Sequence, residues 1–252
     1  MEQKIGEIKD LLQAADINGL PAFINTYESD TRTGVVSLVK RAKKKLEDYE
    51  KEIARTEKMK EFERKYDSFS HICGIDEVGR GPLAGPVVAG AVILPKDCQI
   101  LYLNDSKQLS EKKREELYDV IMEQAVATGL GYVSPERIDE INILQATYEA
   151  MREAIANLSV APDLLLNDAV TIPGVSIKQV PIIKGDAKSV SIAAASIIAK
   201  VTRDRLMVQY DSVFPEYGFA SNKGYGAAMH LEALKKYGPT PIHRKSFIKN
   251  LL

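Results

Sequence analysis

Two adjacent acids inside an apolar run constrain this chain more than any other sequence feature. Extended-favouring apolar residues from Ile72 to Val78 surround Asp76 and Glu77. The bend Gly79-Arg80-Gly81-Pro82 follows, and Pro86 to Leu94 is again strand-like. Buried carboxylates need a cation or hydrogen-bond donors. The stretch therefore predicts a hairpin whose bend combines acids, a cation and accessible backbone, which suits metal-assisted chemistry at a phosphate.

The glycine-rich bend differs from a nucleotide-binding loop. Such a loop joins a strand to a helix whose N-terminus faces the phosphates. Here a second strand follows, Pro82 has no N–H to offer, and no Gly-Lys-Ser or Gly-Lys-Thr follows. We therefore exclude a cofactor cradle. Two interpretations remain at this point, a hairpin with a functional bend and a plain hairpin with two solvated acids.

Composition narrows the class of protein. The 252 residues suffice for one large or two smaller domains, and the net charge of −1 restricts any nucleic-acid surface to a local patch. Cys73 and Cys98 lack metal-ligand spacing and are expected to be reduced and structural. No apolar run reaches the ~18 residues of a membrane span, and the N-terminus lacks a signal-type stretch. We expect a soluble, cytoplasmic protein without membrane contact.

Residues 1–68 form a charged helical extension. Apolar residues at helical spacing predict two short helices and then a long one from about Thr33 to Tyr66. Its basic cluster, Lys40-Arg41 with Lys43 to Lys45, is either a solvated helix face or a contact for a phosphate backbone. Acids at 47, 48, 50 and 52 favour the solvated face. The sequence assigns no function to this extension.

The remainder of the chain, 69–252, mixes strands with helices. Helices are expected over 110–127, 134–158 and 189–210, and strands over 129–133, 163–168 and 179–183. An early hairpin followed by alternating strands and helices is typical of an α/β fold with a mixed sheet.

Acids stand at three separate strand ends. Asp76 with Glu77, Asp168 and Asp186 each close an apolar run. Neighbouring strands lie only ~4.8 Å apart, so these carboxylates can converge, and clustered carboxylates need cations. Mg²⁺ or Mn²⁺ are the natural partners, and two such ions can promote phosphodiester hydrolysis. Successive strand side chains point to opposite faces, so Asp76 and Glu77 share a site only if the strand ends or twists there.

Several blocks of residues match, in order, the motifs of one family. Gly74 to Pro86, GIDEVGRGPLAGP, corresponds to its opening signature. The later blocks are Asp105-Ser106-Lys107 with Leu109-Ser110, Ile143 to Thr147, Lys184 to Asp186, Ser191 to Ile197, Lys200 to Asp204, Gly224 to Gly226, His230-Leu231, and Gly238-Pro239 with Ile242 to Arg244. From about residue 70 to 247 the chain thus resembles ribonuclease HII, a type 2 ribonuclease H. Gly-Arg-Gly, and aspartate at position 186, distinguish it from ribonuclease HIII.

The resemblance implies the ribonuclease H fold, with a mixed central sheet flanked by helices and a C-terminal helical segment, in a catalytic domain of residues 69–252. It also implies a site of four carboxylates that hold the metals, Asp76, Glu77, Asp168 and Asp186. Ala169 stands where the family often has glycine after the third acid. Asp163 competes for that place but begins the strand, so Asp168 is preferred.

Substrate contacts also follow from the resemblance. Gly79, Arg80 and Gly81 are expected to present backbone and guanidinium to the 2′-hydroxyl, the group that distinguishes RNA from DNA. Tyr225 is expected to stack on the next sugar and select an RNA–DNA junction; the alternative is an ordinary loop tyrosine. Candidate phosphate contacts, each with a solvated side chain as the alternative, are Lys107, Lys184, Lys188 and Arg203. His230 and His243 lie in matched motifs without a predicted general-base role.

The expected function is a metal-dependent endoribonuclease using Mg²⁺ or Mn²⁺, with two ions once substrate is bound. It would hydrolyse the RNA strand of RNA–DNA hybrids and nick duplex DNA 5′ to embedded ribonucleotides, leaving 5′-phosphate and 3′-hydroxyl ends. Such an enzyme serves RNA primer removal and ribonucleotide excision repair. The alternatives are a structure-specific DNA nuclease of the same fold and a non-catalytic hybrid-binding module. No obligate protein partner is predicted.

Overall fold

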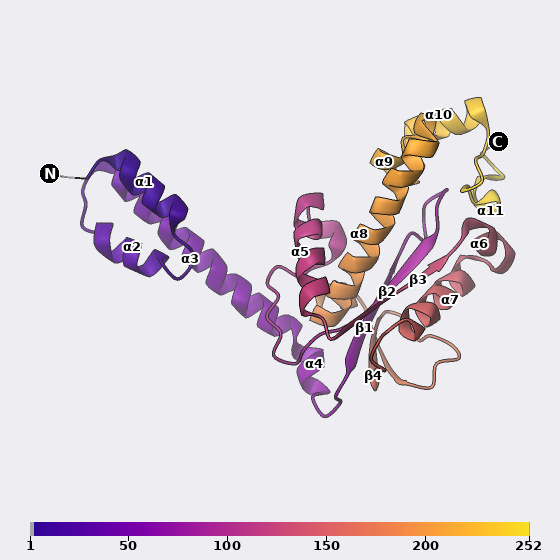
Figure 1. Cartoon of the computed structure of the whole chain (residues 1–252), viewed down its shortest axis with the longest axis horizontal. Helices are drawn as coiled ribbons and strands as arrows, with labels where there is room; N and C mark the ends of the chain where they lie inside the picture. Colours follow the sequence, from indigo (N-terminus) through magenta and orange to yellow (C-terminus); the bar gives the residue numbers. More distant parts are fainter. Residues whose placement is uncertain (1–2, 252) are drawn as a thin grey trace. The chain divides into compact units, whose positions relative to one another are not determined.

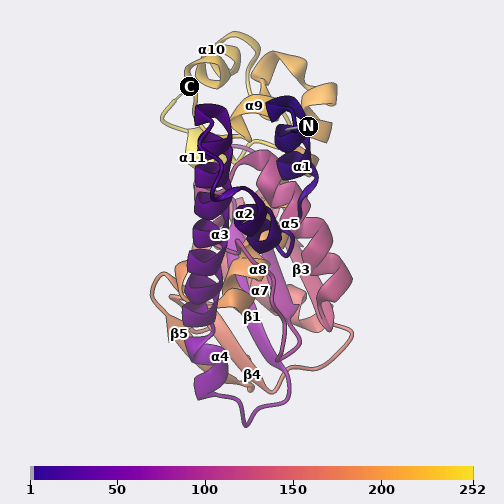
Figure 2. The same ribbon diagram turned by 90° about the vertical axis from the view of Figure 1, so that its left-hand side faces the viewer.

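The computed structural model describes residues 3–251, which form two compact units divided between Glu57 and Lys58. The first unit contains α1 (Ile5–Ala14), α2 (Leu20–Tyr27) and most of α3 (Thr33–Met59) (Figure 1). Its core brings apolar residues from all three helices together, among them Ile8, Leu20, Phe23, Val35 and Ala42. Figure 2 shows α1 and α2 beside the first half of α3. The helical extension is thus present, with a small core of its own.

The predicted long helix ends earlier than expected. It stops at Met59, which is 5% exposed, and α4 (Glu61–Lys65) follows after one residue. Ser189 Oγ and Ser191 N donate to Glu63 Oε1 over 2.6 and 3.1 Å. These contacts hold α4 within the second compact unit, which begins at Lys58.

The second unit is built on a mixed five-stranded sheet in the order β3-β2-β1-β4-β5. The strands are β1 (Ile72–Val78), β2 (Val87–Ile93), β3 (Ala127–Val133), β4 (Leu164–Asp168) and β5 (Lys178–Ile182). β1, β2 and β3 pair antiparallel, whereas β4 runs parallel to both β1 and β5. The expected α/β fold with an early hairpin is confirmed.

Helix α8 (Val190–Val213) packs on one face of this sheet beside α5 (Glu111–Gln124). Helix α8 can approach the sheet this closely only where the strands carry glycine. A Cβ on Gly74 would lie 2.0 Å from the carbonyl carbon of Ser191, and one on Gly90 would lie 2.5 Å from Ala195 O. The small residues of α8 and the strand glycines therefore let the helix lie directly on β1 and β2.

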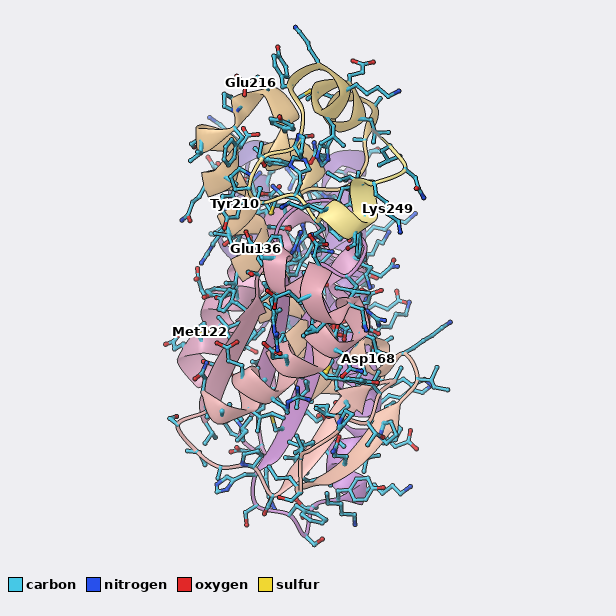
Figure 3. The ribbon with its side chains drawn as sticks, turned by 90° about the vertical axis from the view of Figure 1, so that its right-hand side faces the viewer. Met122, Glu136, Asp168, Tyr210, Glu216 and Lys249 are labelled. Atoms are coloured by element: carbon cyan, nitrogen blue, oxygen red, sulfur yellow. The ribbon has the colours of Figure 1, made fainter. Side chains whose placement is uncertain are left out.

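Helices α6 (Pro135–Ile141) and α7 (Ile143–Ala156) cover the opposite face and appear in front of the sheet in Figure 3. The sequence predicted one helix here. Asn142 has φ 68° and breaks it, and its Oδ1 accepts from Leu144 N and Gln145 N over 3.0 and 3.1 Å. The break therefore begins a new, capped helix.

The C-terminal region is helical, as expected. It contains α9 (Phe219–Asn222), α10 (Ala228–Tyr237) and α11 (Lys245–Ile248). These helices share a small core with Ala84 and Met207, and thus pack against the end of the β1–β2 hairpin loop. Across the described residues, no helix has the length and apolar character needed to cross a membrane.

Candidate functional site

The predicted acids meet at one end of the parallel strands β1 and β4. Ile75 pairs with Asn167, so the next residues, Asp76 and Asp168, lie side by side toward the C-terminal ends of the two strands. Asp168 Oδ1 accepts a 2.7 Å hydrogen bond from Gly185 N. That bond holds the turn after β5, which contains Asp186. Strand pairing and one backbone contact thus bring together acids that lie up to 110 residues apart in sequence, from Asp76 to Asp186.

Asp76 and Glu77 face different surroundings, as strand geometry requires. Asp76 is 5% exposed and its carboxyl is hydrogen-bonded to Ser196 of α8. Glu77 Oε1 lies 3.2 Å from an Arg80 nitrogen. β1 ends at Val78, so both carboxylates lie near the C-terminal end of this strand. Burial raises the pKa of both carboxyls, and the negative charge of Asp168 adds to each shift.

The cluster has more negative charge than its surroundings neutralise. Burial raises the pKa of Asp76 well above its ordinary value, and the charge of Glu77 raises it further. Burial also raises the pKa of Asp186 to about 6, with the charges of Asp105 and Asp168 adding to the effect. Burial raises the pKa of Glu77 despite the opposing charge of Arg80. A bound cation would reverse these shifts, because it favours the ionised form.

The acids fit a divalent cation by donor type. Mg²⁺ and Mn²⁺ prefer oxygen ligands, and Mg²⁺ is commonly held by one or two carboxylates together with water and substrate phosphate. Within residues 3–251, no group of three or more His, Cys, Asp or Glu side chains is arranged to hold a metal ion. The acids match such an ion in ligand type, and Mg²⁺ held by them would take its other ligands from water and phosphate.

The loop from Asp105 to Lys107 borders this site. Lys107 is exposed; burial lowers its pKa, but the charges of Asp105, Asp76 and Asp186 outweigh this and raise it. Ser106 Oγ lies 3.0 Å from Ser196 Oγ, which in turn contacts Asp76. Sequence analysis gave a role to Lys107 alone, although the quoted motifs contain Asp105, Ser106 and Ser196 as well.

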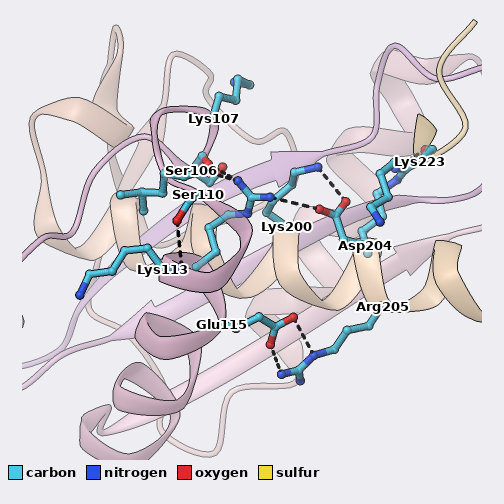
Figure 4. Close-up of polar contacts among 12 residues, drawn as sticks. Ser106, Lys107, Ser110, Lys113, Glu115, Lys200, Asp204, Arg205 and Lys223 are labelled. Atoms are coloured by element: carbon cyan, nitrogen blue, oxygen red, sulfur yellow. Dashed lines mark hydrogen bonds and ion pairs between the residues drawn. The ribbon is translucent and has the colours of Figure 1, made fainter. Parts of the chain in front are cut away.

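A polar network anchors that loop to α8 (Figure 4). Arg114 donates to Ser106 O over 3.1 Å and to Leu109 O, and lies 3.7 Å from Asp204. Lys200 pairs with the same aspartate at 2.7 Å. The helix that contacts Asp76 thus also positions the Lys107 loop.

Two buried arginines, Arg203 and Arg244, fix the backbone around the Gly-Arg-Gly bend by donating hydrogen bonds to its carbonyl groups and to those of the following loop. Arg244 donates to the carbonyls of Gly79, Arg80 and Gly85. Burial lowers the pKa of Arg244 to about 9 and that of Arg203 to about 10. Because these guanidiniums bind carbonyl oxygens, the bend keeps a fixed backbone path.

Arg203 is 0% exposed and donates to the carbonyls of Pro86, Ala84 and Lys223. This burial contradicts the prediction that Arg203 contacts phosphate. Its side chain shapes the bend: Gly79, at φ +90°, has no room for a Cβ, which would lie 2.3 Å from Arg203 Nε.

The other predicted substrate residues lie on the surface around the bend and the acids. The Tyr225 side chain is 46% exposed, and its Cε1 is 3.6 Å from the position of a Cβ on Gly81. Lys184 and Lys188 are exposed on either side of Asp186. The structure thus brings Tyr225 beside the Gly-Arg-Gly bend and places exposed lysines next to an acid.

Comparison with known proteins identifies relatives over the whole chain. The family description "Ribonuclease HII" matches residues 73–250, and "Ribonuclease HII N-terminal domain" matches residues 4–67. A "Ribonuclease HII" of Lachnoclostridium phytofermentans is 64% identical over 251 residues, covering 100% of this chain and 99% of the relative. One from Clostridioides difficile is 54% identical over 253 residues, with 100% and 99% covered.

Solved structures agree with this match. The "ribonuclease H2 from Pyrococcus horikoshii OT3" superposes with a TM-score of 0.60 at 29% sequence identity. The alignment covers 72% of this chain and 97% of that one. The shared part therefore has the size of the second unit.

Proposed function

We infer the site of activity from one premise: the chain belongs to the ribonuclease HII family and is therefore a ribonuclease H, a phosphodiester hydrolase acting on RNA–DNA hybrids. We propose that residues 69–252 carry this activity. We propose that they also nick duplex DNA 5′ to embedded ribonucleotides. The observation that carries this proposal is the position of the acids. The four acids Asp76, Glu77, Asp168 and Asp186 gather at one end of the strands, close to Tyr225 and to the Gly-Arg-Gly bend, of which Arg80 and Gly81 are exposed.

In this proposal the four acids hold Mg²⁺ or Mn²⁺, two ions once substrate is bound. When bound, such ions activate a water and stabilise the leaving oxygen of a phosphodiester. The raised pKa values of Asp76, Glu77 and Asp186 support this assignment, because cations would stabilise their ionised forms. Cleavage would leave 5′-phosphate and 3′-hydroxyl ends.

Recognition of the ribonucleotide is assigned to the bend. Gly79, Arg80 and Gly81 would contact the 2′-hydroxyl, and Tyr225 would stack on the sugar that follows. The 3.6 Å approach of Tyr225 to Gly81 supports a joint surface for these contacts. The exposed phosphate contacts are Lys107, Lys184 and Lys188. The proposed roles are RNA primer removal and ribonucleotide excision repair, in the cytoplasm.

The test compares three duplexes in Mg²⁺ and in Mn²⁺: DNA with one ribonucleotide, all-DNA, and an RNA–DNA hybrid. We expect a nick 5′ to the ribonucleotide, cleavage of the hybrid RNA strand, and no cleavage of all-DNA. Asp76→Asn should lower the rate by at least about a thousandfold while duplex binding persists.

Asp163→Asn is the matched control. Asp163 accepts from Ser70 N and His71 N just before β4, at the opposite end of this strand from Asp168. Its loss should leave cleavage within about twofold. Equal cleavage of all-DNA would indicate a structure-specific DNA nuclease instead, and binding without cleavage would indicate a binding module.

A further inference from the structure

Two histidines of the C-terminal region form a buried pair. His230 is 0% exposed and His243 is 3% exposed, and their Nε2 atoms lie 2.9 Å apart. Neither belongs to the carboxylate site. A contact between two imidazole nitrogens is a hydrogen bond only if one nitrogen carries the proton and the other accepts it.

The two ends of the pair determine where the protons are. Thr240 N is 2.9 Å from His243 Nδ1, and a backbone N–H only donates, so that nitrogen accepts. His230 Nδ1 is 2.8 Å from Tyr225 O, and a carbonyl only accepts, so that nitrogen carries hydrogen. With both rings neutral, His243 Nε2–H must then donate to His230 Nε2. One proton arrangement satisfies all three contacts, which form a relay from Thr240 to Tyr225.

Aromatic rings fix the orientation of both imidazoles. The Tyr217 ring lies 5.2 Å from that of His243, and the Phe219 ring lies 5.2 Å from that of His230, edge-on. Burial, together with the neighbouring His230, lowers the pKa of His243 to about 4, and burial lowers the pKa of His230. Both rings are therefore neutral at pH 7, as the relay requires. Their protons are committed to hydrogen bonds, which leaves no general-acid role.

The relay connects the two elements assigned to ribonucleotide recognition. Beside His243, Gly85 N donates to Ile242 O over 2.8 Å and Arg244 N donates to Leu83 O over 2.9 Å. These bonds join the backbone on both sides of His243 to the loop residues that follow the Gly-Arg-Gly bend. At the other end, the relay terminates on the backbone of Tyr225, whose ring lies beside Gly81.

We propose that His230 and His243 are positioning residues for substrate selection, and that their relay holds the Tyr225 backbone in register with the Gly-Arg-Gly bend. The proposal rests on the function proposed above for Tyr225. The relay sets where the tyrosine ring stands relative to Gly81, and hence how well a junction between a ribonucleotide and DNA fits between them.

Two substitutions at His230 separate the contacts of the relay. In His230→Asn the amide nitrogen replaces Nδ1, so donation to Tyr225 O is kept and the contact with His243 is lost. In His230→Gln the amide replaces Nε2, so the contact with His243 is kept and donation to Tyr225 is lost. Each variant therefore breaks the relay at a different contact, and His71→Gln, at the chain's remaining histidine, is the control outside the relay.

We expect His230→Gln to lower kcat/KM for the single-ribonucleotide duplex about fivefold to tenfold, and to affect the RNA–DNA hybrid less. His230→Asn keeps the donor to Tyr225 O but removes its support by His243, so we expect a smaller loss of about threefold with the same preference for that duplex. His71→Gln should cause no measurable loss on either substrate. In a Tyr225→Ala background, His230→Gln should add no further loss. A loss in the histidine variants that is equal on the two substrates, or an undiminished effect of His230→Gln beside Tyr225→Ala, would overturn the relay.

The same variants distinguish a failure of the relay from a failure of the role proposed for Tyr225. If Tyr225→Ala leaves both substrates unchanged, the proposed role of Tyr225 fails and the relay fails with it. If Tyr225→Ala is selective for the junction but His230→Gln has no effect, the relay alone fails.

A spectroscopic measurement keeps the proposal testable if a variant does not fold. The chain has three histidines, so ¹⁵N-histidine labelling of the wild-type protein gives a simple imidazole spectrum. At pH 7, we expect two neutral rings of opposite tautomer, protonated on Nδ1 in His230 and on Nε2 in His243. Identical tautomers, or a charged ring in the pair, would contradict the relay.

Discussion

The carboxylate site and the arginine–histidine cluster (Arg203, Arg244, His230 and His243) both bury polar groups, but their polar groups are satisfied differently. In the carboxylate site, burial and mutual repulsion raise the pKa of Asp76. In the arginine–histidine cluster, the guanidinium groups donate to backbone carbonyls and the imidazoles complete a chain of hydrogen bonds.

This difference indicates that the carboxylate site carries out the chemistry and that the arginine–histidine cluster positions the substrate-facing backbone. An unsatisfied buried charge costs stability, and such groups concentrate at functional sites because a ligand or metal later satisfies them. A fully bonded polar network instead gives rigidity and a specific geometry. The bend that faces the substrate is therefore supported by satisfied groups, and the reaction is assigned to groups that still need a cation.

The largest effect should come from breaking the satisfied network. Arg244→Met leaves the carbonyls of Gly79, Arg80 and Gly85 without a buried donor, so we expect a loss of about 3 kcal/mol in the free energy of unfolding. Urea unfolding measures it. Arg205→Met is the control, because Arg205 makes an exposed ion pair with Glu115 and should lose no more than about 1 kcal/mol. Equal losses would remove the contrast between the clusters.

An intermediate effect of opposite sign should come from the carboxylate site. The pKa of Asp186 is about 6 in the folded protein against an ordinary 3.8, so the folded state holds the proton more tightly. Stability of the metal-free protein should therefore fall as pH rises from about 4 to about 6, and stay low above that range. Asp186→Asn should thus stabilise the protein at pH 7.5, by about 1–2 kcal/mol after allowance for solvent screening.

Urea unfolding in a chelator, from pH 4 to pH 8, checks this prediction. The advantage of Asp186→Asn should shrink toward the acid end, where the carboxyl is protonated in the folded state and increasingly protonated in the unfolded state. Saturating Mg²⁺ should then stabilise the wild type more than the variant. A destabilised variant at pH 7.5 in chelator would show that the acids are already satisfied, and the comparison would fail.

The smallest effect concerns the backbone next to the third acid. Ala169 has φ 56°, a conformation that glycine adopts at lower cost. Ala169→Gly should raise the free energy of unfolding by about 0.5–1 kcal/mol, measured by thermal unfolding. Ala54→Gly, at an exposed interior position of α3, should instead lower it by about 1 kcal/mol. Two changes of the same sign would show that no strain is stored beside Asp168.

Short-range patterns predicted the elements well, and errors arose where distant contacts intervene. Alternation and helical spacing located the five strands and the major helices. The helix expected from Thr33 to Tyr66 ends at Met59, because burial of Met59 and the Glu63 contacts turn the chain. The helix expected from Pro135 to Leu158 breaks at Asn142, whose local hydrogen bonds compete with helix continuation.

By itself, the sequence determined the α/β class and the family resemblance and predicted the four acids, because strand periodicity and motif residues are properties of neighbouring positions. Only the tertiary structure decided how polar groups are partnered. Burial turned Arg203 from an expected phosphate contact into a support of the bend, and it placed Ser196 on Asp76 and joined His230 to His243. The physical reason is that burial and hydrogen bonding depend on atoms brought together by folding, over separations that no local pattern records.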